Sequence, residues 1–221
     1  MKVLVVGTAC EQVEFKKKFG ASLDCTFQEN HDFSNLALQD YSVVFDYLIE
    51  ENPEALQEYL PLKDVMVFVN IPKMSLAELV HVFGKGECML AGFNGIKTFV
   101  DRPKLEISLL DKAHQKRLDE VMKLLQTEYL LVEDRVGMVI PRILVSIINE
   151  AYYTLQEGSA DREDIDTAMK LSTRYPFGPF EWCEKVGIVQ VYELLEAIYE
   201  DTKDERHKIC PMLKREYLLN S

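Results

Sequence analysis

The predicted fold is decided by three segments within residues 133–188: Pro141-Arg-Ile-Leu-Val-Ser-Ile-Ile-Asn-Glu-Ala151, Glu163-Asp-Ile-Asp-Thr-Ala-Met-Lys-Leu171 and Tyr175-Pro-Phe-Gly-Pro-Phe-Glu181. In the first segment, apolar residues recur at three- and four-residue spacing, which predicts a helix with a wide buried face. Pro141 lies in the first turn of this helix, where its missing N–H costs nothing. Residues 133–221 are therefore predicted to form an all-helical C-terminal domain.

The connections in this region carry their own signals. Gly158 follows the first helix at a position suited to a helix C-terminus, and the next helix is predicted to begin near Asp161. Gly178 and Pro179 then predict a rigid connection. Beyond that connection, apolar residues continue at helical spacing through residues 182–198.

Taken together, these segments resemble the C-terminal domain of the 3-hydroxyacyl-CoA dehydrogenase family. The resemblance rests on the order and spacing of Asn149-Glu-Ala151, Glu163–Leu171, Tyr175–Glu181 and Val186-Gly187, and it extends to Pro211-Met-Leu-Lys214. A chance helical bundle would not require a Tyr-Pro-x-Gly-Pro element. The resemblance implies NAD-dependent oxidation of a 3-hydroxyacyl-CoA to a 3-ketoacyl-CoA in fatty-acid metabolism. It also implies a homodimer built through the helical half, for which the apolar residues 182–198 would provide a surface.

Length and composition limit the number of domains and the classes of partner. The 221 residues allow one or two domains, and 48% hydrophobic content is ordinary for a globular protein. A net charge of -12 argues against nucleic acid or an anionic membrane as a partner, since both need clustered cations. The five cysteines form no Cys-x-x-Cys pair, so no metal site or redox motif is predicted, and a cytoplasmic location is expected. No apolar run is long enough for a signal peptide or a membrane span.

Residues 1–132 are predicted to form an abridged, Rossmann-like α/β domain. Strands are expected near residues 2–6, 23–28, 41–45, 65–70, 88–93 and 105–109, and helices near residues 9–19, 53–59, 75–82 and 112–127. This alternation favours a mostly parallel sheet covered on both faces. The chain is shorter than the family before Tyr41, which would remove part of the NAD-binding sheet.

The turn after the first strand departs from the dinucleotide-binding pattern. Gly7 matches the first glycine of that pattern, but Ala9 and Gln12 stand in place of the second and third. Ala9 adds a Cβ where the dinucleotide would pass. Glu11 places negative charge near a helix N-terminus that should attract phosphate. These residues predict that a normal pyrophosphate site is absent.

The family resemblance assigns individual positions to ligands. It assigns Gly7, Glu50 and Asn70 to NAD, and Asn94 and Arg142 to the acyl-CoA substrate. Asp24 and Glu29 are further candidates for the acid that binds ribose, or are plain loop carboxylates.

The catalytic positions are altered. Ala91 stands where the family has its catalytic histidine, and Glu106 matches the glutamate that orients this histidine. The family's serine after Asn70 and its asparagine before Arg142 are not matched either. Glu106 could act as a base alone or be an ordinary strand-end glutamate. His81 or His114 could supply an imidazole only if the fold brought one of them to the site.

Three functions therefore compete. The first is a divergent, working NAD-dependent 3-hydroxyacyl-CoA dehydrogenase. The second is a non-catalytic dimer that binds acyl-CoA between its domains, near Asn70, Asn94 and Glu106. The third is a scaffold for another acyl-CoA enzyme.

Overall fold

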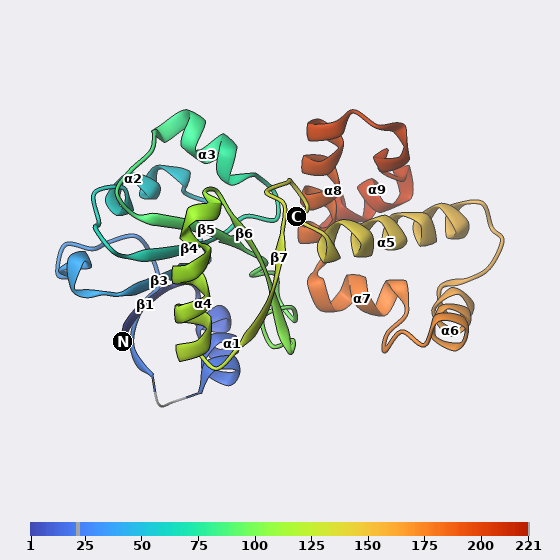
Figure 1. The fold of residues 1–221 in the computed structure, drawn as a ribbon. Coiled ribbons are helices and arrows are strands. Elements are labelled where there is room, and N and C mark those ends of the chain that lie inside the picture. Colours follow the sequence, from blue (N-terminus) through green and yellow to red (C-terminus); the bar gives the residue numbers. More distant parts are fainter. Residues whose placement is uncertain (21–22, 221) are drawn as a thin grey trace. The chain divides into compact units, whose positions relative to one another are not determined.

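In the computed structural model, which describes residues 1–20 and 23–220, the chain divides into two units after Met138 (Figure 1). The predicted domain boundary at residue 133 lies a few residues earlier. Residues between the two positions are tied to the N-terminal unit. Asp134 accepts hydrogen bonds from the backbone N–H groups of Leu76 (2.8 Å) and Ala77 (2.9 Å), and the Gly137 N–H donates to the Pro72 carbonyl (2.6 Å).

The N-terminal unit contains a seven-stranded sheet in the order β2-β1-β3-β4-β5-β6-β7 (Figure 1). The strands are β1 (Lys2–Val6), β2 (Asp24–Gln28), β3 (Val43–Asp46), β4 (Met66–Asn70), β5 (Met89–Phe93), β6 (Lys104–Leu109) and β7 (Glu128–Val132). Neighbouring strands are parallel except for β5 and β6. The predicted mostly parallel sheet is confirmed. It is also abridged, because only β2 lies outside β1, where the dinucleotide-binding fold has two strands.

Helices cover both faces of this sheet, and each face has its own apolar core. The helical segments are α1 (Ala9–Phe19), η1 (Leu38–Asp40), η2 (Pro53–Ala55), α2 (Leu56–Tyr59), α3 (Leu76–Phe83), η3 (Lys112–His114) and α4 (Gln115–Leu124). Helices α1 and α4 contribute Phe15 and Leu118 to one core, and α2 and α3 contribute Tyr59 and Leu76 to the other. The strands alternate between the two cores because successive side chains point to opposite faces.

Strand β7 was not predicted from the sequence. The helix expected over residues 112–127 ends at Leu124, and Glu128–Val132 pairs in parallel with β6. Leu130 and Leu131 are 44% and 39% exposed, so this edge strand lacks both a continuous buried run and a clean two-residue alternation.

The C-terminal unit is all helical, as expected. Its segments are α5 (Ile140–Gln156), α6 (Arg162–Thr173), α7 (Pro179–Val186), α8 (Ile188–Thr202), η4 (Glu205–His207) and α9 (Pro211–Asn220). Pro141 lies in the first turn of α5, Gly158 follows its end with φ +73°, and Asp161 caps α6. These three predictions are confirmed.

One use of the apolar residues 182–198 is corrected. Trp182, Val191 and Leu195 are at most 6% exposed within this unit, so they form its own core and not a free dimer surface. In the described ranges, no helix has the length and apolarity needed to cross a bilayer.

Candidate functional site

The carboxyl ends of β1, β3, β4 and β5 bring most of the predicted site residues to one edge of the sheet. The chain crosses from β2 over β1 to β3, so the strand order reverses next to β1. In open α/β sheets, ligands bind in the crevice at such a reversal. What fills this crevice therefore decides whether a dinucleotide can bind.

The turn at Gly7 is held by side chains of α1 itself. The Thr8 N–H donates to Glu11 Oε2 at 2.7 Å, and Gln12 Nε2 donates to the Gly7 carbonyl at 2.8 Å. A Cβ built on Gly7 would lie 3.0 Å from Glu11 Oε2, so the carboxylate rests directly against the turn. Burial raises the pKa of Glu11, hydrogen bonds from Thr8 oppose this, and the charges of Glu51 and Asp46 add to the rise.

A second contact, between His31 and Asp46, spans the carboxyl end of β1. His31 follows β2, Asp46 ends β3, and their side chains meet at 2.8 Å between Nε2 and Oδ2, although β1 lies between the two strands. Asp46 is fully buried and also accepts hydrogen bonds from the Tyr59 hydroxyl (2.9 Å) and the Leu48 N–H (2.8 Å). Neither His31 nor Asp46 was among the predicted site residues. An aspartate that ends a buried strand was the available signal.

The dinucleotide implied by the family resemblance does not fit these residues. A bound pyrophosphate needs free N–H groups at the N-terminus of α1, and Glu11 already accepts the Thr8 N–H there. The phosphates would also meet the negative charges of Glu11, Asp46 and Glu51. Gly7, assigned to NAD by resemblance, is thus in its expected turn, but the anion position beside it is filled.

The other two residues assigned to NAD tie loops together. Glu50 accepts a hydrogen bond from the Lys73 N–H, and Lys73 Nζ lies 3.8 Å from its carboxylate, whose side chain is only 7% exposed. Asn70 donates to the Tyr47 carbonyl (3.3 Å) and accepts from the Gly95 N–H (2.8 Å). Each of these contacts joins the ends of neighbouring strands or the segments that follow them.

Asn70, Asn94 and Glu106 do lie in one connected network. Asn94 Nδ2 donates to Glu106 Oε2 at 3.4 Å, and Asn94 is next in sequence to Gly95, which Asn70 holds. Asn94 and Glu106 are 2% and 3% exposed, and Asn70 is 9% exposed. The predicted grouping of these side chains is present, but it is buried.

Ala91 and Glu106 lie on opposite faces of the sheet. Ala91 packs in the same core as Leu105, Ile107 and Leu109, and strand alternation places Glu106 on the other face. Ser108 lies on that other face with Glu106, because its Oγ is 2.6 Å from a Cβ built on Gly92. An imidazole at position 91 would therefore enter the apolar core and could not meet Glu106.

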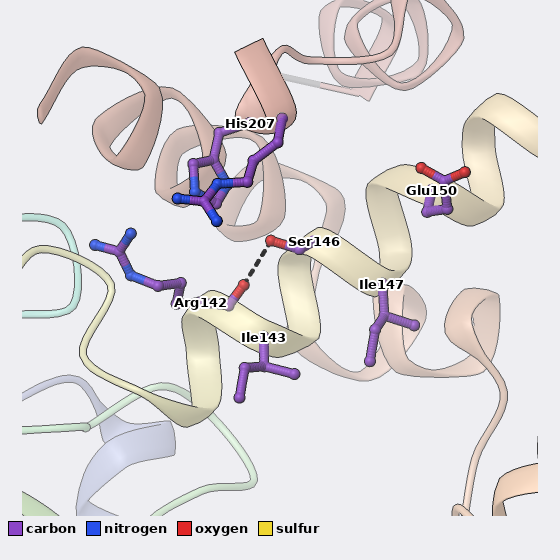
Figure 2. A pocket seen from close by; sticks show the side chains of 7 residues that line it. Arg142, Ile143, Ser146, Ile147, Glu150 and His207 are labelled. Carbon is purple, nitrogen blue, oxygen red and sulfur yellow. Dashed lines mark hydrogen bonds between the residues drawn. The ribbon is translucent and has the colours of Figure 1, made fainter. Parts of the chain in front are cut away.

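Arg142, the last of the predicted site residues, lies in the helical unit. It lines a pocket of about 440 Å³ between α5 and η4 (Figure 2). Arg142 is 4.0 Å from Asp201, and the pocket also includes Arg206 and His207. Within the described part of the chain, no group of three His, Cys, Asp or Glu side chains could hold a metal ion.

The motif residues of the helical unit hold its fold. Asp166 is 8% exposed and accepts hydrogen bonds from the Phe180 N–H (2.8 Å) and the Glu181 N–H (3.1 Å) at the start of α7. A Cβ on Gly178 would lie 2.4 Å from Asp166, so only glycine lets this carboxylate approach. Glu181 in turn accepts the Gly178 N–H and pairs with Lys170.

Comparisons with known proteins match the helical unit by its family model and, at lower identity, most of the chain. Residues 137–220 match the C-terminal domain of 3-hydroxyacyl-CoA dehydrogenase. The chain is similar to 3-hydroxyadipyl-CoA dehydrogenase of Escherichia coli (strain K12), with 41% identity over 92 residues, which cover 42% of this chain and 19% of that protein. It is also similar to 3-hydroxybutyryl-CoA dehydrogenase of Bradyrhizobium diazoefficiens, with 27% identity over 215 residues, which cover 95% of this chain. The chain spans 61% of the length of that relative.

Solved structures extend the likeness in fold to the whole chain. FadB2 of M. tuberculosis superimposes with a TM-score of 0.78 at 17% identity, covering 99% of this chain and 94% of that one. (S)-3-hydroxybutyryl-CoA dehydrogenase PaaH1 of Ralstonia eutropha gives a TM-score of 0.77 at 16% identity, with the same coverage. At such identities the likeness establishes the fold and not the activity.

Proposed function

Because the chain belongs to the 3-hydroxyacyl-CoA dehydrogenase-like family, we propose that it is a member that binds acyl-CoA without transferring hydride. One observation carries this proposal: the Glu11 carboxylate takes the Thr8 N–H at the N-terminus of α1, where the family's NAD would place its pyrophosphate. The acyl-CoA part of the proposal comes from the relatives, whose names specify 3-hydroxyadipyl-CoA and 3-hydroxybutyryl-CoA.

The catalytic positions support the same conclusion. Oxidation of a hydroxyl group needs a base, and a positioned base accelerates such a step by roughly 10²–10⁴-fold. Glu106 is buried against Asn94, and Ala91 lies in the opposite core, so a histidine at position 91 could not pair with Glu106. Glu106 is therefore proposed as a strand-tying residue, with the acyl-CoA ligand near Asn70 and Asn94.

The proposed division of work follows the two parts of the chain. Residues 1–138 provide the Rossmann-like domain, and the helical unit that begins at Val139 provides a homodimer contact. An apolar groove of about 480 Å³ between α5 and α6, lined by Ile147, Ile165 and Met169, supports such a contact. A monomer in sedimentation at micromolar concentration would remove the dimer. The five unpaired cysteines fit the proposed cytoplasmic location.

Thermal-shift titrations with NADH and with acetoacetyl-CoA test the proposal. A ligand that binds only the native state adds about 2.7 kcal/mol at one hundred times its dissociation constant. We expect a shift with acetoacetyl-CoA and none with NADH. A shift with NADH would restore the working dehydrogenase as the better function, and no shift with either ligand would favour the scaffold.

A double variant sharpens the NADH arm. Ala9→Gly with Glu11→Ala removes the Cβ at position 9, the negative charge at the turn and the acceptor that occupies the Thr8 N–H. If Glu11 and Ala9 exclude the dinucleotide, this variant should gain an NADH-dependent shift that the unaltered chain lacks. If neither protein responds, the missing outer strand beside β2 is the stronger obstacle.

A further inference from the structure

The pocket that Arg142 lines has two ends of opposite charge. Along α5, its wall is formed by Arg142, Ile143, Ser146, Ile147 and Glu150, which recur at four-residue steps (Figure 2). Arg142 and Glu150 are eight residues apart, or roughly 12 Å along the helix. Figure 2 shows Arg142 and His207 toward one end, with the two isoleucines along α5 and Glu150 further on. The pocket thus has a basic end, an apolar middle and an acidic end.

The second wall comes from η4 and contains a polar group without a partner. His207 is 6% exposed, and its Nδ1 has no hydrogen bond with any residue that the structure describes. Buried polar groups in folded proteins are nearly always paired, so an unpaired one at a pocket wall points to a missing water or ligand. Burial lowers the pKa of His207, and Arg142 and Arg206 lower it further against the opposing effect of Asp204.

Arg206 supplies a cation that a ligand can reach. Its side chain is 74% exposed, and its pair with Asp204, the N-cap of η4, is a partly solvated contact at 2.9 Å. Exposed pairs of this kind contribute little, so an incoming anion can share the guanidinium. Ser146 cannot serve as a donor, because its hydroxyl already donates to the Arg142 carbonyl at 2.8 Å.

The middle of the pocket is apolar. Ile143 is 53% exposed, and Ile147 is half-buried beside it on the same face of α5. The volume of about 440 Å³ falls within the range of small-molecule sites. A small inorganic anion would leave these isoleucines uncovered, whereas an alkyl chain would cover them.

We propose that this pocket binds an amphiphilic carboxylate, with its head at Arg206 and His207 and its alkyl chain along Ile143 and Ile147. The acidic Glu150 end fixes the orientation, because it repels the carboxylate head. The site lies wholly within the helical unit, so it does not depend on the state of the dinucleotide crevice, although Ile147 also lines the groove proposed for the homodimer contact.

Calorimetry on the full chain with octanoate tests the site. Octanoate should bind, whereas octanol, which has the same chain without the charge, should bind at least about tenfold more weakly. Arg206→Gln should weaken octanoate binding about tenfold, the loss expected for one charge-assisted hydrogen bond. Arg215→Gln is the matched control, because Arg215 is an exposed arginine of α9 that does not line the pocket.

Ile143→Glu tests the apolar wall along which the alkyl chain would lie, without disturbing the core, since Ile143 is exposed. The Ile143→Glu variant should bind octanoate more weakly. In the unaltered chain, the pKa of His207, followed by NMR, should rise when octanoate binds. The proposal is overturned if octanoate does not bind, if octanol binds equally well, or if Arg206→Gln and Arg215→Gln bind it alike.

Discussion

Two helix N-termini in this molecule are each held by a carboxylate, with opposite consequences for function. At α7, Asp166 accepts two backbone N–H groups and needs Gly178 for its close approach, and both residues belong to the motif shared with the family. At α1, Glu11 accepts the Thr8 N–H within a turn that departs from the family pattern. The motif shared with the family holds the helical fold, whereas at the altered turn a similar contact is proposed to keep the pyrophosphate of NAD out.

The largest effect is expected from Ala91→His, which places the family's histidine at position 91 of the N-terminal unit. Ala91 is fully buried in β5, in the core that contains Phe68 and Phe93. Overpacking costs about 1–3 kcal/mol and an unpaired buried polar group about as much again, so we expect a loss of about 3 kcal/mol or more in the free energy of unfolding. Urea denaturation followed by circular dichroism measures it.

Ala91→Ser is the matched control, because it adds a polar atom with little volume and should cost much less. No dehydrogenase activity should appear in the Ala91→His protein, since the new ring and Glu106 lie on opposite faces. A histidine variant as stable as the unaltered chain would show that position 91 has room, and the assigned faces of β5 and β6 would then be wrong.

Asp166→Ala tests the structural role of the motif that the helical unit shares with the family. Two N–H groups at the start of α7 would lose their acceptor in a buried place, so we expect a loss of about 2–3 kcal/mol. The fluorescence of Trp182, the only tryptophan, reports directly on α7 during urea unfolding. Glu163→Ala, in the exposed first turn of α6, is the control and should change stability by about 0.3–1 kcal/mol. Equal losses in the two variants would remove the structural role of Asp166.

Sequence reasoning succeeded where local patterns and packing agree. The caps at Asp161 and Gly158 and the first-turn Pro141 are short-range signals, and the structure contains all three. Strand β7 escaped because it forms by pairing with β6, and its exposed Leu130 and Leu131 give no strand pattern in the sequence. The apolar stretch at residues 182–198 looked like a free surface, because a helical stripe does not reveal which helix will cover it.

The site was harder to predict than the fold for a physical reason. Family resemblance identified Asn70, Asn94 and Glu106 as a group, and they are linked in space. It could not show that Glu106 and Ala91 face opposite ways, because this depends on the antiparallel register of β5 and β6. The contact between His31 and Asp46 could not be predicted either, since it joins the segment after β2 to the end of β3 across β1.

The smallest expected effect concerns Glu11→Gln and its dependence on pH. The pKa of Glu11 in the folded chain lies above its ordinary value of 4.5, chiefly because of burial. The folded state therefore favours the protonated form. This contribution to stability is fully present below pH 4.5 and is lost as the pH rises through the folded-state pKa. Glutamine does not ionise, so the stability of the variant relative to the unaltered chain should improve between pH 4 and pH 7, as measured by urea unfolding at both. Glu54→Gln, at an exposed position of the same unit, corrects for the loss of one negative charge. A relative stability that falls over this range would mean that the Thr8 hydrogen bonds outweigh burial, and the turn would then hold an ionised carboxylate at a net gain.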